Sequence, residues 1–530
     1  MFGNKQNLIL NIALILIIAI ASYMAFSNLG GNPVSLNQDE AINGYDAYSI
    51  GLTGKDHHGA TQPQPMLQSF NDWTSPLITF ITIPFVKIFG LEIWSIRLPV
   101  ALLGVLSIVL FYLLTIQIFK SKKVAVLGAA IWAFSPWLIS ISRWAIPPSI
   151  VPFFLLFFLV LLVYSLNSKE NNFKTWFLYI LTGIAAGALT YAYPTMKLFV
   201  PVFLGAIALL ILMLYREKFK NIFVSGFTCL LIISPIFYLT LLEPEKYNAR
   251  YAYTSIGGTG ENIFTGFILR YFEYFTPIFA FGFGDPNNMH KVQSFSSIAS
   301  FLSLFFYLGL MYIVYKIYTK KIQFIKDNIN LSIIVLGLLI FPVAAALTKD
   351  HFMLLRTIHG FVFITIFILI GLRLIYIKLK SSKLQIALFI SIGLLLIFNV
   401  ASFFIFYMNY YPDSAKAGFN YGVKEAFEYV DANDEKYSKV YIDRGINSIY
   451  YLFFTKYDPE KLHANNSDDK FRIFKEDSII FEDIEKSDMI NPKLLFLVED
   501  HNKIWYSIYE SEDKMYVFKE LQYKDAKYQF

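Results

Sequence analysis

The residues best suited to chemistry lie in a polar stretch near the start of the chain, SLNQDEAINGYDAYSIGLTGKDHH, residues 35–58. It places two adjacent carboxylates, Asp39 and Glu40, directly after an apolar run, and it ends in His57 and His58. Placing an ionised carboxylate at a membrane surface costs free energy, so such a residue is a functional candidate by default. A carboxylate within hydrogen-bond reach of a hydroxyl can also take its proton as the oxygen attacks. We therefore predict Asp39 and Glu40 as catalytic residues, with Asp39 as the base.

Basic side chains that could hold an anion follow later in the chain. Lys349 and Arg356 lie in one short connection, Arg270 and Lys291 in the long segment 242–296, and Arg97 at the start of an apolar run. Such cations can grip a phosphate and stabilise the charge that grows on it as a bond breaks. Acids and bases beside an apolar domain suit a substrate with a phosphate head and a lipid tail. A sugar carried on a polyprenyl phosphate is such a substrate.

Composition identifies the domain that must position these residues. Hydrophobic residues make up 56% of the 530-residue chain and charged residues only 16%, with 53 Phe and 35 Tyr. A soluble protein of this length needs far more charge to cover its surface. Several apolar runs reach the ~20 residues that cross a bilayer. The chain is therefore predicted to be a multi-pass membrane protein.

The apolar runs predict an all-α membrane domain of about eleven transmembrane helices. They cover approximately residues 8–27, 97–119, 124–142, 149–166, 175–192, 197–215, 221–241, 297–318, 331–348, 354–377 and 384–409. A shorter run, Ser75–Phe89, is interrupted by Pro76, Pro84 and Lys87. We expect it to form an interfacial or re-entrant helix in the first outer loop.

Lysine and arginine clusters predict the orientation. With eleven spans, five clusters fall on one side, which should be the cytoplasmic side. They are Lys120, Lys122 and Lys123; Lys169 and Lys174; Arg216, Lys218 and Lys220; Lys316, Lys320, Lys321 and Lys326; and Arg373, Lys378, Lys380 and Lys383. The loop that bears Asp39 and everything after residue 410 then face outward. The predicted location is the cytoplasmic membrane, with an extracytoplasmic active site.

The chain changes character at about Tyr411. Residues 411–530 hold 24 of the 39 acidic residues and 17 of the 45 basic ones, whereas residues 1–410 hold the other 15 and 28. KEAFEYVDAND predicts a helix, and SKVYID, NPKLLFLVED and MYVFKEL predict strands. We therefore predict two domains: a transmembrane domain, 1–410, and a small soluble α/β domain, 411–530.

Several segments together resemble a known family. They include NQDEAINGYDAYS, SPLITFITIPFVKIFGLEIWSIRLPVALLGVLSI, SPWLISISRWAIPPSIVPFF, ALTYAYPTMKLFVPVFL, FGFGDPNNMHKV and ALTKDHFMLLRT. Their order is similar to that of bacterial membrane glycosyltransferases of the protein O-mannosyltransferase and aminoarabinose-transferase type, which have the GT-C fold. The resemblance implies an enzyme that transfers a hexose or pentose from a polyprenyl-phosphate donor to an acceptor on the outer face.

The resemblance also implies roles for particular residues. The acidic residue of the family's first outer loop, taken to be the catalytic base, matches Asp39, and the basic residues associated with lipid phosphate match Lys349 and Arg356. One departure concerns the second outer loop, where relatives often carry an acid after an SR-W or SR-A motif. Here Arg143 is followed by Trp144, Ala145, Ile146, Pro147 and Pro148. Without that acid, Asp39 is expected to work alone.

Each of these residues also has a structural alternative. Asp39 could instead cap a helix, and Glu40 could be a helix-start residue. Arg97 could orient its helix, and Lys349 and Arg356 could be interfacial residues that snorkel. His57, His58, His290, His351 and His359 match no established metal motif, so structural or substrate hydrogen bonding is expected of them, and we predict His58 as a substrate-binding residue. We therefore predict no metal ligands, and a divalent metal stays open as a cofactor.

Two other classes of protein stay open as functions. One is a transporter or flippase of lipid-linked glycans, although transporters place charges near the bilayer midplane and show internal repeats. The other is a non-catalytic family member that acts as a scaffold. The predicted partners are a polyprenyl-phosphate sugar, membrane lipids and a protein, lipid or cell-wall glycan acceptor, with no nucleic acid.

Overall fold

The computed structural model describes residues 2–69, 72–168, 172–465, 473–474, 478–485, 487, 489–500 and 503–523. The chain divides into two compact units. Unit 1 consists of Met1–Ser27, Pro65–Ile78 and Val100–Tyr410, and unit 2 consists of Asn28–Gln64, Thr79–Pro99 and Tyr411–Phe530. The predicted division into domains 1–410 and 411–530 stays a prediction.

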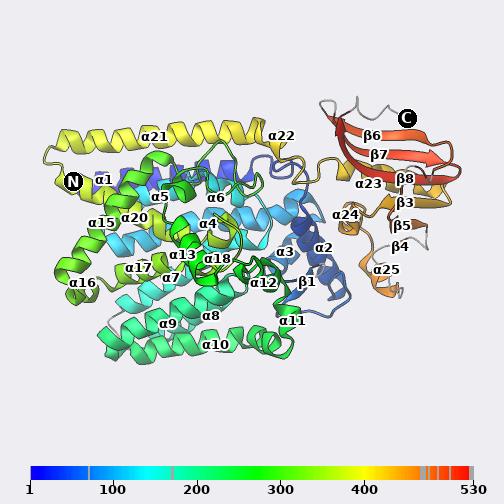
Figure 1. Cartoon of the computed structure of the whole chain (residues 1–530). Coiled ribbons are helices and arrows are strands. Elements are labelled where there is room, and N and C mark those ends of the chain that lie inside the picture. Colours follow the sequence, from blue (N-terminus) through cyan, green and yellow to red (C-terminus); the bar gives the residue numbers. More distant parts are fainter. Residues whose placement is uncertain are drawn as a thin grey trace. The chain divides into compact units, whose positions relative to one another are not determined.

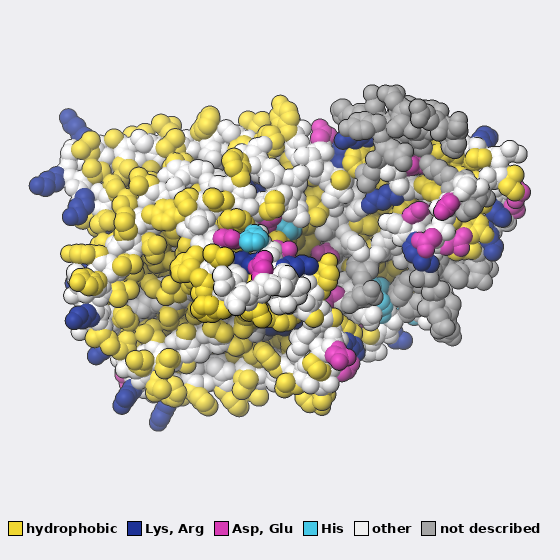
Figure 2. All heavy atoms as spheres, in the orientation of Figure 1, with side chains coloured by type: hydrophobic (Ala, Val, Ile, Leu, Met, Phe, Trp, Pro, Cys, Tyr) yellow, Lys and Arg dark blue, Asp and Glu magenta, His cyan; other side chains and the backbone are white. Residues whose placement is uncertain are grey.

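Unit 1 is built from long apolar helices (Figure 1). The described residues include ten helical segments long and apolar enough to cross a membrane. They correspond to α1 (Phe2–Phe26), α4 (Ile93–Phe119), α7 (Val151–Asn167), α8 (Phe173–Thr190), α9 (Met196–Leu214), α10 (Phe219–Leu242), α15 (Ser303–Lys320), α17 (Ile329–Ile340) with α18 (Val343–Ala346), α20 (Gly360–Lys378) and α21 (Ser382–Asn409). Figure 2 shows hydrophobic side chains over much of the visible surface of these helices. A multi-pass, all-α membrane domain is thereby confirmed.

Residues 124–142 do not form the single transmembrane helix that the sequence predicted. It forms two shorter helices, α5 (Lys122–Ala133) and α6 (Pro136–Ile141), with Phe134 and Ser135 between them. Proline has no N–H to continue the hydrogen-bond ladder and is favoured in the first turn of a new helix. The break is fully packed, because Trp137 stacks on Phe361 and meets Trp132 edge-on.

The short run Ser75–Phe89 does form a helix, α3 (Leu77–Phe89), of 13 residues with Pro84 inside it. Its length falls short of a full crossing. Its expected place at the membrane interface stays a prediction.

Basic side chains gather at one end of unit 1, where α1 begins and α16 (Ile322–Asp327) lies (Figures 1 and 2). Members of three predicted clusters, Lys120, Lys316 and Lys378, line one cavity. Lys169, from another cluster, lies outside the described residues. That this end faces the cytoplasm stays a prediction.

Short elements connect several of the long helices of unit 1. They are β1 (Leu67–Ser69) paired with β2 (Asp72–Thr74), α11 (Pro244–Tyr247), α12 (Ala249–Thr254), α13 (Ile263–Glu273), α14 (Pro277–Phe281) and α19 (Leu354–Thr357). Short helices joined by loops leave many backbone groups for side chains to satisfy. The polar residues described below do much of this.

Unit 2 contains α2 (Gln38–Thr53) and a six-stranded sheet with the order β4-β5-β3-β8-β7-β6. The strands are β3 (Lys439–Asp443), β4 (Ile473–Phe474), β5 (Ile479–Glu482), β6 (Lys493–Asp500), β7 (Lys503–Ser511) and β8 (Lys514–Tyr523). β3 runs parallel to both β5 and β8, with Val440 opposite Ile479 and Met515. The helices are α22 (Tyr411–Ala415), α23 (Val423–Asn433), α24 (Ser448–Phe454) and α25 (Pro459–Ala464). The predicted helix and the three predicted strands of the α/β region are confirmed.

Candidate functional site

The first turn of α2 holds the two adjacent acids in different environments. Asn37 is the N-cap, and its Oδ1 accepts a hydrogen bond from the Glu40 N–H at 3.0 Å. The Glu40 Oε2 in turn accepts from the Asn37 N–H at 3.3 Å. This reciprocal capping box fixes where the helix begins.

Arg97 pairs with Glu40, and neither side chain is exposed to solvent. The Arg97 Nε lies 2.7 Å from Glu40 Oε1 and its Nη2 lies 2.9 Å from Oε2. The remaining N–H groups donate to the backbone carbonyls of Leu29, Pro33 and Ser35 at 2.6–3.2 Å. All five donors of the guanidinium are therefore used within the loop that leads into α2.

Asp39 precedes Glu40 in the same helical turn, yet it is exposed whereas Glu40 is buried. Successive helical residues point about 100° apart, so one faces the core while its neighbour faces solvent. The negative charge of Asp39 acts on Tyr450 of α24, a buried phenol in the same unit. Burial raises the pKa of Tyr450 well above its ordinary value, and the charges of Tyr506, Asp39 and Glu40 add to the shift.

A third acid of α2, Asp46 in the middle of the helix, ties it to the loop that follows. Asp46 is buried, and its Oδ1 accepts from the His57 backbone N–H at 2.8 Å and lies 2.6 Å from His57 Nδ1. The rings of His57 and His58 lie 4.1 Å apart, and His58 is half-buried. The arrangement holds His58 in place, while its role in substrate binding stays a prediction.

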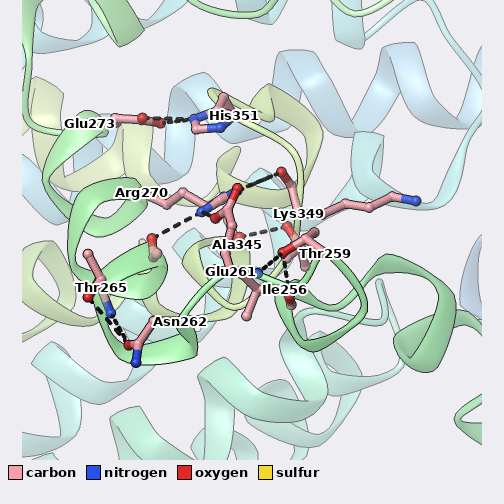
Figure 3. A network of polar contacts seen from close by, with 12 residues as sticks. Ile256, Thr259, Glu261, Asn262, Thr265, Arg270, Glu273, Ala345, Lys349 and His351 are labelled. Atoms are coloured by element: carbon pink, nitrogen blue, oxygen red, sulfur yellow. Dashed lines mark hydrogen bonds and ion pairs between the residues drawn. The ribbon is translucent and has the colours of Figure 1, made fainter.

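In unit 1, Arg270 of α13 organises the loop that contains Lys349 (Figure 3). Its Nη1 lies 2.9 Å from Glu261 Oε2, and its Nε and Nη2 donate to the Lys349 carbonyl at 3.3 and 3.1 Å. Arg270 is only 3% exposed, whereas Glu261 is 50% exposed. The hydrogen bond from Arg270 lowers the pKa of Glu261.

Lys349 and Arg356, the predicted phosphate-binding pair, lie in the same segment. The Lys349 side chain points away from Arg270 (Figure 3), and its Nζ lies 4.1 Å from the centre of the Tyr253 ring. The Arg356 Nη1 contacts Asp350 Oδ2 at 2.8 Å and Thr348 Oγ1 at 2.5 Å. Asp350 is 38% exposed, so the far side of this ion pair meets solvent.

The loop GDPNNMHK is anchored to the start of α19, the helix that carries Arg356. The buried Asp285 Oδ2 accepts from the Leu354 N–H at 2.9 Å and also lies 2.9 Å from His290 Nδ1. Lys291 is buried as well, and its Nζ donates to the Gly282 carbonyl at 2.7 Å. Burial lowers the pKa of Lys291 from 10.5 to about 8, opposed by the charge of Asp285. Lys291 is thus held in the loop core.

In the loop predicted to be the second outer one, no acid directly follows Arg143, and this arginine binds backbone carbonyls. Arg143 is fully buried. Its Nη1 donates to the carbonyls of Met24 and Ala25, and its Nη2 donates to that of Ser27. These carbonyls belong to the last turn of α1 and the residue after it, where a helix leaves acceptors without partners.

One further cation, Lys197 in the first turn of α9, is not among the residues predicted from the sequence. Its half-buried side chain donates to the sulfur of Met66 at 3.4 Å, a weak acceptor. It forms no ion pair with a described carboxylate. A lysine within the apolar run YPTMKLFVPVF was the available signal, because charge inside a predicted span marks a functional candidate.

The structure therefore groups the predicted residues into separate sets. Glu40 and Arg97 form one pair beside Asp39, and Arg270, Lys349, Arg356 and Lys291 belong to one connected set of loops. In the described parts of the chain, no three His, Cys, Asp or Glu side chains gather closely enough to hold a metal ion.

Comparison with known proteins agrees with this architecture. Residues 74–246 match the family model of dolichyl-phosphate-mannose-protein mannosyltransferase. No curated protein sequence matches the chain. The solved structure of ArnT from Cupriavidus metallidurans bound to undecaprenyl phosphate is 12% identical, with a TM-score of 0.54, and the match covers 86% of this chain and 88% of that chain. The archaeal oligosaccharyltransferase AglB from Archaeoglobus fulgidus, in complex with an inhibitory peptide and a dolichol-phosphate, is 13% identical with a TM-score of 0.52, over 83% of this chain and 62% of that chain.

These comparisons confirm the predicted fold class. The chain has the GT-C fold of membrane glycosyltransferases, and about a third of it matches the mannosyltransferase family model. The predicted resemblance to enzymes that use polyprenyl-phosphate-linked sugars is thereby confirmed.

Proposed function

We propose that this chain transfers a sugar from a polyprenyl-phosphate donor to an acceptor at the extracytoplasmic face of the cytoplasmic membrane, with Asp39 as the base. The observation that carries the proposal is the contrast within one helical turn. Glu40 is fully buried in a capping box and an ion pair, whereas Asp39 is exposed. Of the two acids, only Asp39 can meet an incoming hydroxyl without dismantling the start of α2.

In this reaction, Asp39 accepts the proton of the acceptor hydroxyl as its oxygen attacks the anomeric carbon. The bond between that carbon and the phosphate oxygen breaks, and polyprenyl phosphate leaves with the electron pair. Partial deprotonation of the nucleophile by a positioned carboxylate is worth ~10²–10⁴-fold in rate. The first turn of α2 holds Asp39 on a regular helix, which limits its freedom more than a loop would.

The leaving phosphate needs cations, and Arg356 and Lys349 supply them. A guanidinium can bind a phosphate through two parallel hydrogen bonds, stronger than those between neutral groups. Arg356 already holds the half-exposed Asp350 through one contact, between its Nη1 and Asp350 Oδ2, and a phosphate can take the place of that carboxylate. Arg270 fixes the backbone of Lys349 through its carbonyl. We assign Arg270 and Lys291 to positioning of these loops, and Arg97 to positioning of the helix that bears Asp39.

The acceptor is proposed to be a hydroxyl on a protein, lipid or cell-wall glycan. AglB was solved with a peptide and a dolichol-phosphate, and ArnT with undecaprenyl phosphate. These ligands support a lipid phosphate as the leaving group here. The α/β region of unit 2 is proposed to face the same side as Asp39.

The test is a transfer assay on the purified full-length chain with undecaprenyl-phosphate-[³H]mannose and a cell-envelope acceptor fraction. Release of undecaprenyl phosphate and transfer of label are both measured. Asp39→Asn should lower kcat by ~10²–10⁴-fold with donor binding retained. Arg356→Ala should weaken donor binding by roughly 10–100-fold, as expected for loss of a charge-assisted hydrogen bond.

Matched variants control for charge and folding. Glu92→Gln removes an exposed acid of unit 2, and Arg250→Ala removes an exposed arginine of unit 1; both should keep full activity. Wild-type turnover in Asp39→Asn would remove Asp39 as the base. Donor binding without transfer to any acceptor would favour the scaffold, and donor translocation across vesicles without transfer would favour the flippase.

A further inference from the structure

A large cavity lies at the lysine-rich end of unit 1, away from every residue assigned above to catalysis or donor binding. Its volume is about 1090 Å³, which exceeds the ~300–1,000 Å³ of typical small-molecule pockets. The ends of α4, α7, α15 and α20 and the start of α17 surround it. Because these are the ends of membrane-length helices, the cavity lies at the depth where a helix leaves the apolar layer.

Two helices form its walls with the same pattern of residues. On α15 the lining residues are Leu308, Met311, Tyr312, Tyr315 and Lys316, and on α20 they are Ile370, Arg373, Leu374, Ile377 and Lys378. Both sets follow the spacing i, i+3, i+4, i+7, i+8, which is one face of a helix. Each face carries apolar side chains and ends with a lysine in the last turns of its helix, and on α20 Arg373 lies between Ile370 and Leu374. The lining therefore combines apolar and basic side chains.

The two helices that form the walls cross each other at a fixed point of close contact. Gly309 of α15 and Gly371 of α20 lie where the helices touch, and a Cβ on either glycine would overlap the backbone of Phe367 or Phe305. The lining residues Met311–Lys316 and Arg373–Lys378 follow this crossing in the chain. The cavity is thus a feature of the helix packing.

The lining includes four cations, Lys120, Lys316, Arg373 and Lys378. Among the described residues, none of the four forms an ion pair with a carboxylate. Lys120 donates to Gln117 Oε1 at 2.9 Å, and the Arg373 Nη1 donates to the Phe119 carbonyl at 3.4 Å. Asp327 is the acid among the lining residues, and its Oδ1 accepts from Gln323 Nε2 at 2.7 Å. The lining is therefore net positive by three charges.

We propose that this cavity binds an anionic glycerophospholipid of the membrane leaflet at this end of unit 1. The phosphodiester lies against Lys316, Arg373 and Lys378, and the upper acyl chains lie against Leu308, Met311 and Leu374. Charge complementarity selects an anionic head, since basic pockets between transmembrane helices hold such lipid headgroups. The apolar side chains of the lining select a lipid over a soluble phosphate. This inference is independent of the proposed sugar transfer.

The test measures lipid binding to the purified full-length chain in detergent, by native mass spectrometry and by thermal unfolding. The added lipids are dioleoylphosphatidylglycerol and, as the neutral-headgroup comparison, dioleoylphosphatidylcholine. The variant Lys316→Gln/Arg373→Gln/Lys378→Gln removes three lining cations. The control Lys320→Gln/Lys380→Gln/Lys383→Gln removes three cations from the same end that do not line the cavity.

We expect the wild type to retain phosphatidylglycerol in preference to phosphatidylcholine and to unfold at a higher temperature with it. The lining variant should bind phosphatidylglycerol about 100-fold more weakly, and the control should change little. Circular dichroism and a check of monodispersity serve to test that both variants fold. Equal retention of the two lipids, or an equal loss in the control, would overturn the proposal. So would equal stabilisation by inorganic phosphate alone, or displacement of phosphatidylglycerol by equimolar undecaprenyl phosphate.

Discussion

Two arginines, one in each unit, show how differently a guanidinium can be used in the same chain. Arg97 is wholly buried against a wholly buried Glu40, and its remaining donors go to three backbone carbonyls. Arg356 is 12% exposed, and its carboxylate partner Asp350 is 38% exposed. The first arginine is enclosed by its loop, whereas the second faces a partner that solvent can reach.

The difference separates charges that hold the fold from charges that can exchange partners. Removing one partner of a buried pair leaves an unpaired charge without water, which is far costlier than breaking a pair at the surface. Arg97 therefore cannot turn to a substrate without losing the loop before α2. Arg356 can exchange Asp350 for another anion at little cost.

The largest effect is expected for Arg97→Met. It should lower the free energy of unfolding by ~3–5 kcal/mol, because the charge of Glu40 then stays buried without the guanidinium that balances it. Thermal unfolding of the purified chain, with its yield in membranes, measures this loss. The double variant Glu40→Met/Arg97→Met should recover part of the stability, since replacing both partners avoids the stranded charge.

The exposed pair of Lys456 and Glu92 in the same unit is the control. These side chains are 50% and 44% exposed with Nζ and Oε1 2.6 Å apart. Lys456→Met should change the free energy of unfolding by no more than ~1 kcal/mol. A loss in Lys456→Met as large as that in Arg97→Met would contradict the distinction between the two kinds of pair.

Much of the fold could be predicted because its signals are local. Runs of apolar residues long enough to cross a bilayer became helices, and alternating residues such as KVYID became a strand. The failure at 124–142 was local too, since hydropathy does not register that Pro136 ends one helix and begins another. The cavity at the basic end could not be predicted, because it depends on how α15 and α20 cross.

The site was only partly predictable, because burial depends on distant residues. Asp39 and Glu40 look equivalent in the sequence, and a residue 57 positions after Glu40 separates their roles. The importance of Asp350 and Thr348 as partners of Arg356 was likewise absent from any motif. Lys197 was overlooked because it sits inside a run that hydropathy assigns to the membrane.

Lys291 extends the comparison to a buried cation that can lose its charge. Its pKa is lowered to about 8, so the unfolded chain binds more protons than the folded chain between pH 8 and 10.5. The contribution of Lys291 to the free energy of unfolding should therefore rise with pH across this window, by roughly 3 kcal/mol at most. Unfolding midpoints of the wild type at pH 8 and pH 10.5 measure the rise.

Lys291→Met is the control for this titration, because it removes the group and keeps its length. The free energy of unfolding of the wild type minus that of the variant should be larger at pH 10.5 than at pH 8, because only the wild type gains stability from this titration. If this difference in the free energy of unfolding did not change with pH across the window, burial would not lower the pKa of Lys291.

The smallest effect on stability is expected for Asp350→Asn. Since Asp350 is partly exposed, its loss should change the free energy of unfolding by ~0–1 kcal/mol. The variant should also bind undecaprenyl-phosphate-mannose as well as or a few-fold more tightly than the wild type, because the donor phosphate no longer competes with a carboxylate for Arg356. Asp285→Asn provides the contrast: Asp285 is buried and holds the Leu354 N–H and His290, so its variant should lose ~1–3 kcal/mol. If Asp350→Asn instead weakened donor binding as much as Arg356→Ala, Asp350 would be a positioning residue that Arg356 needs, and the exchangeable pair would be of the same kind as the enclosed one.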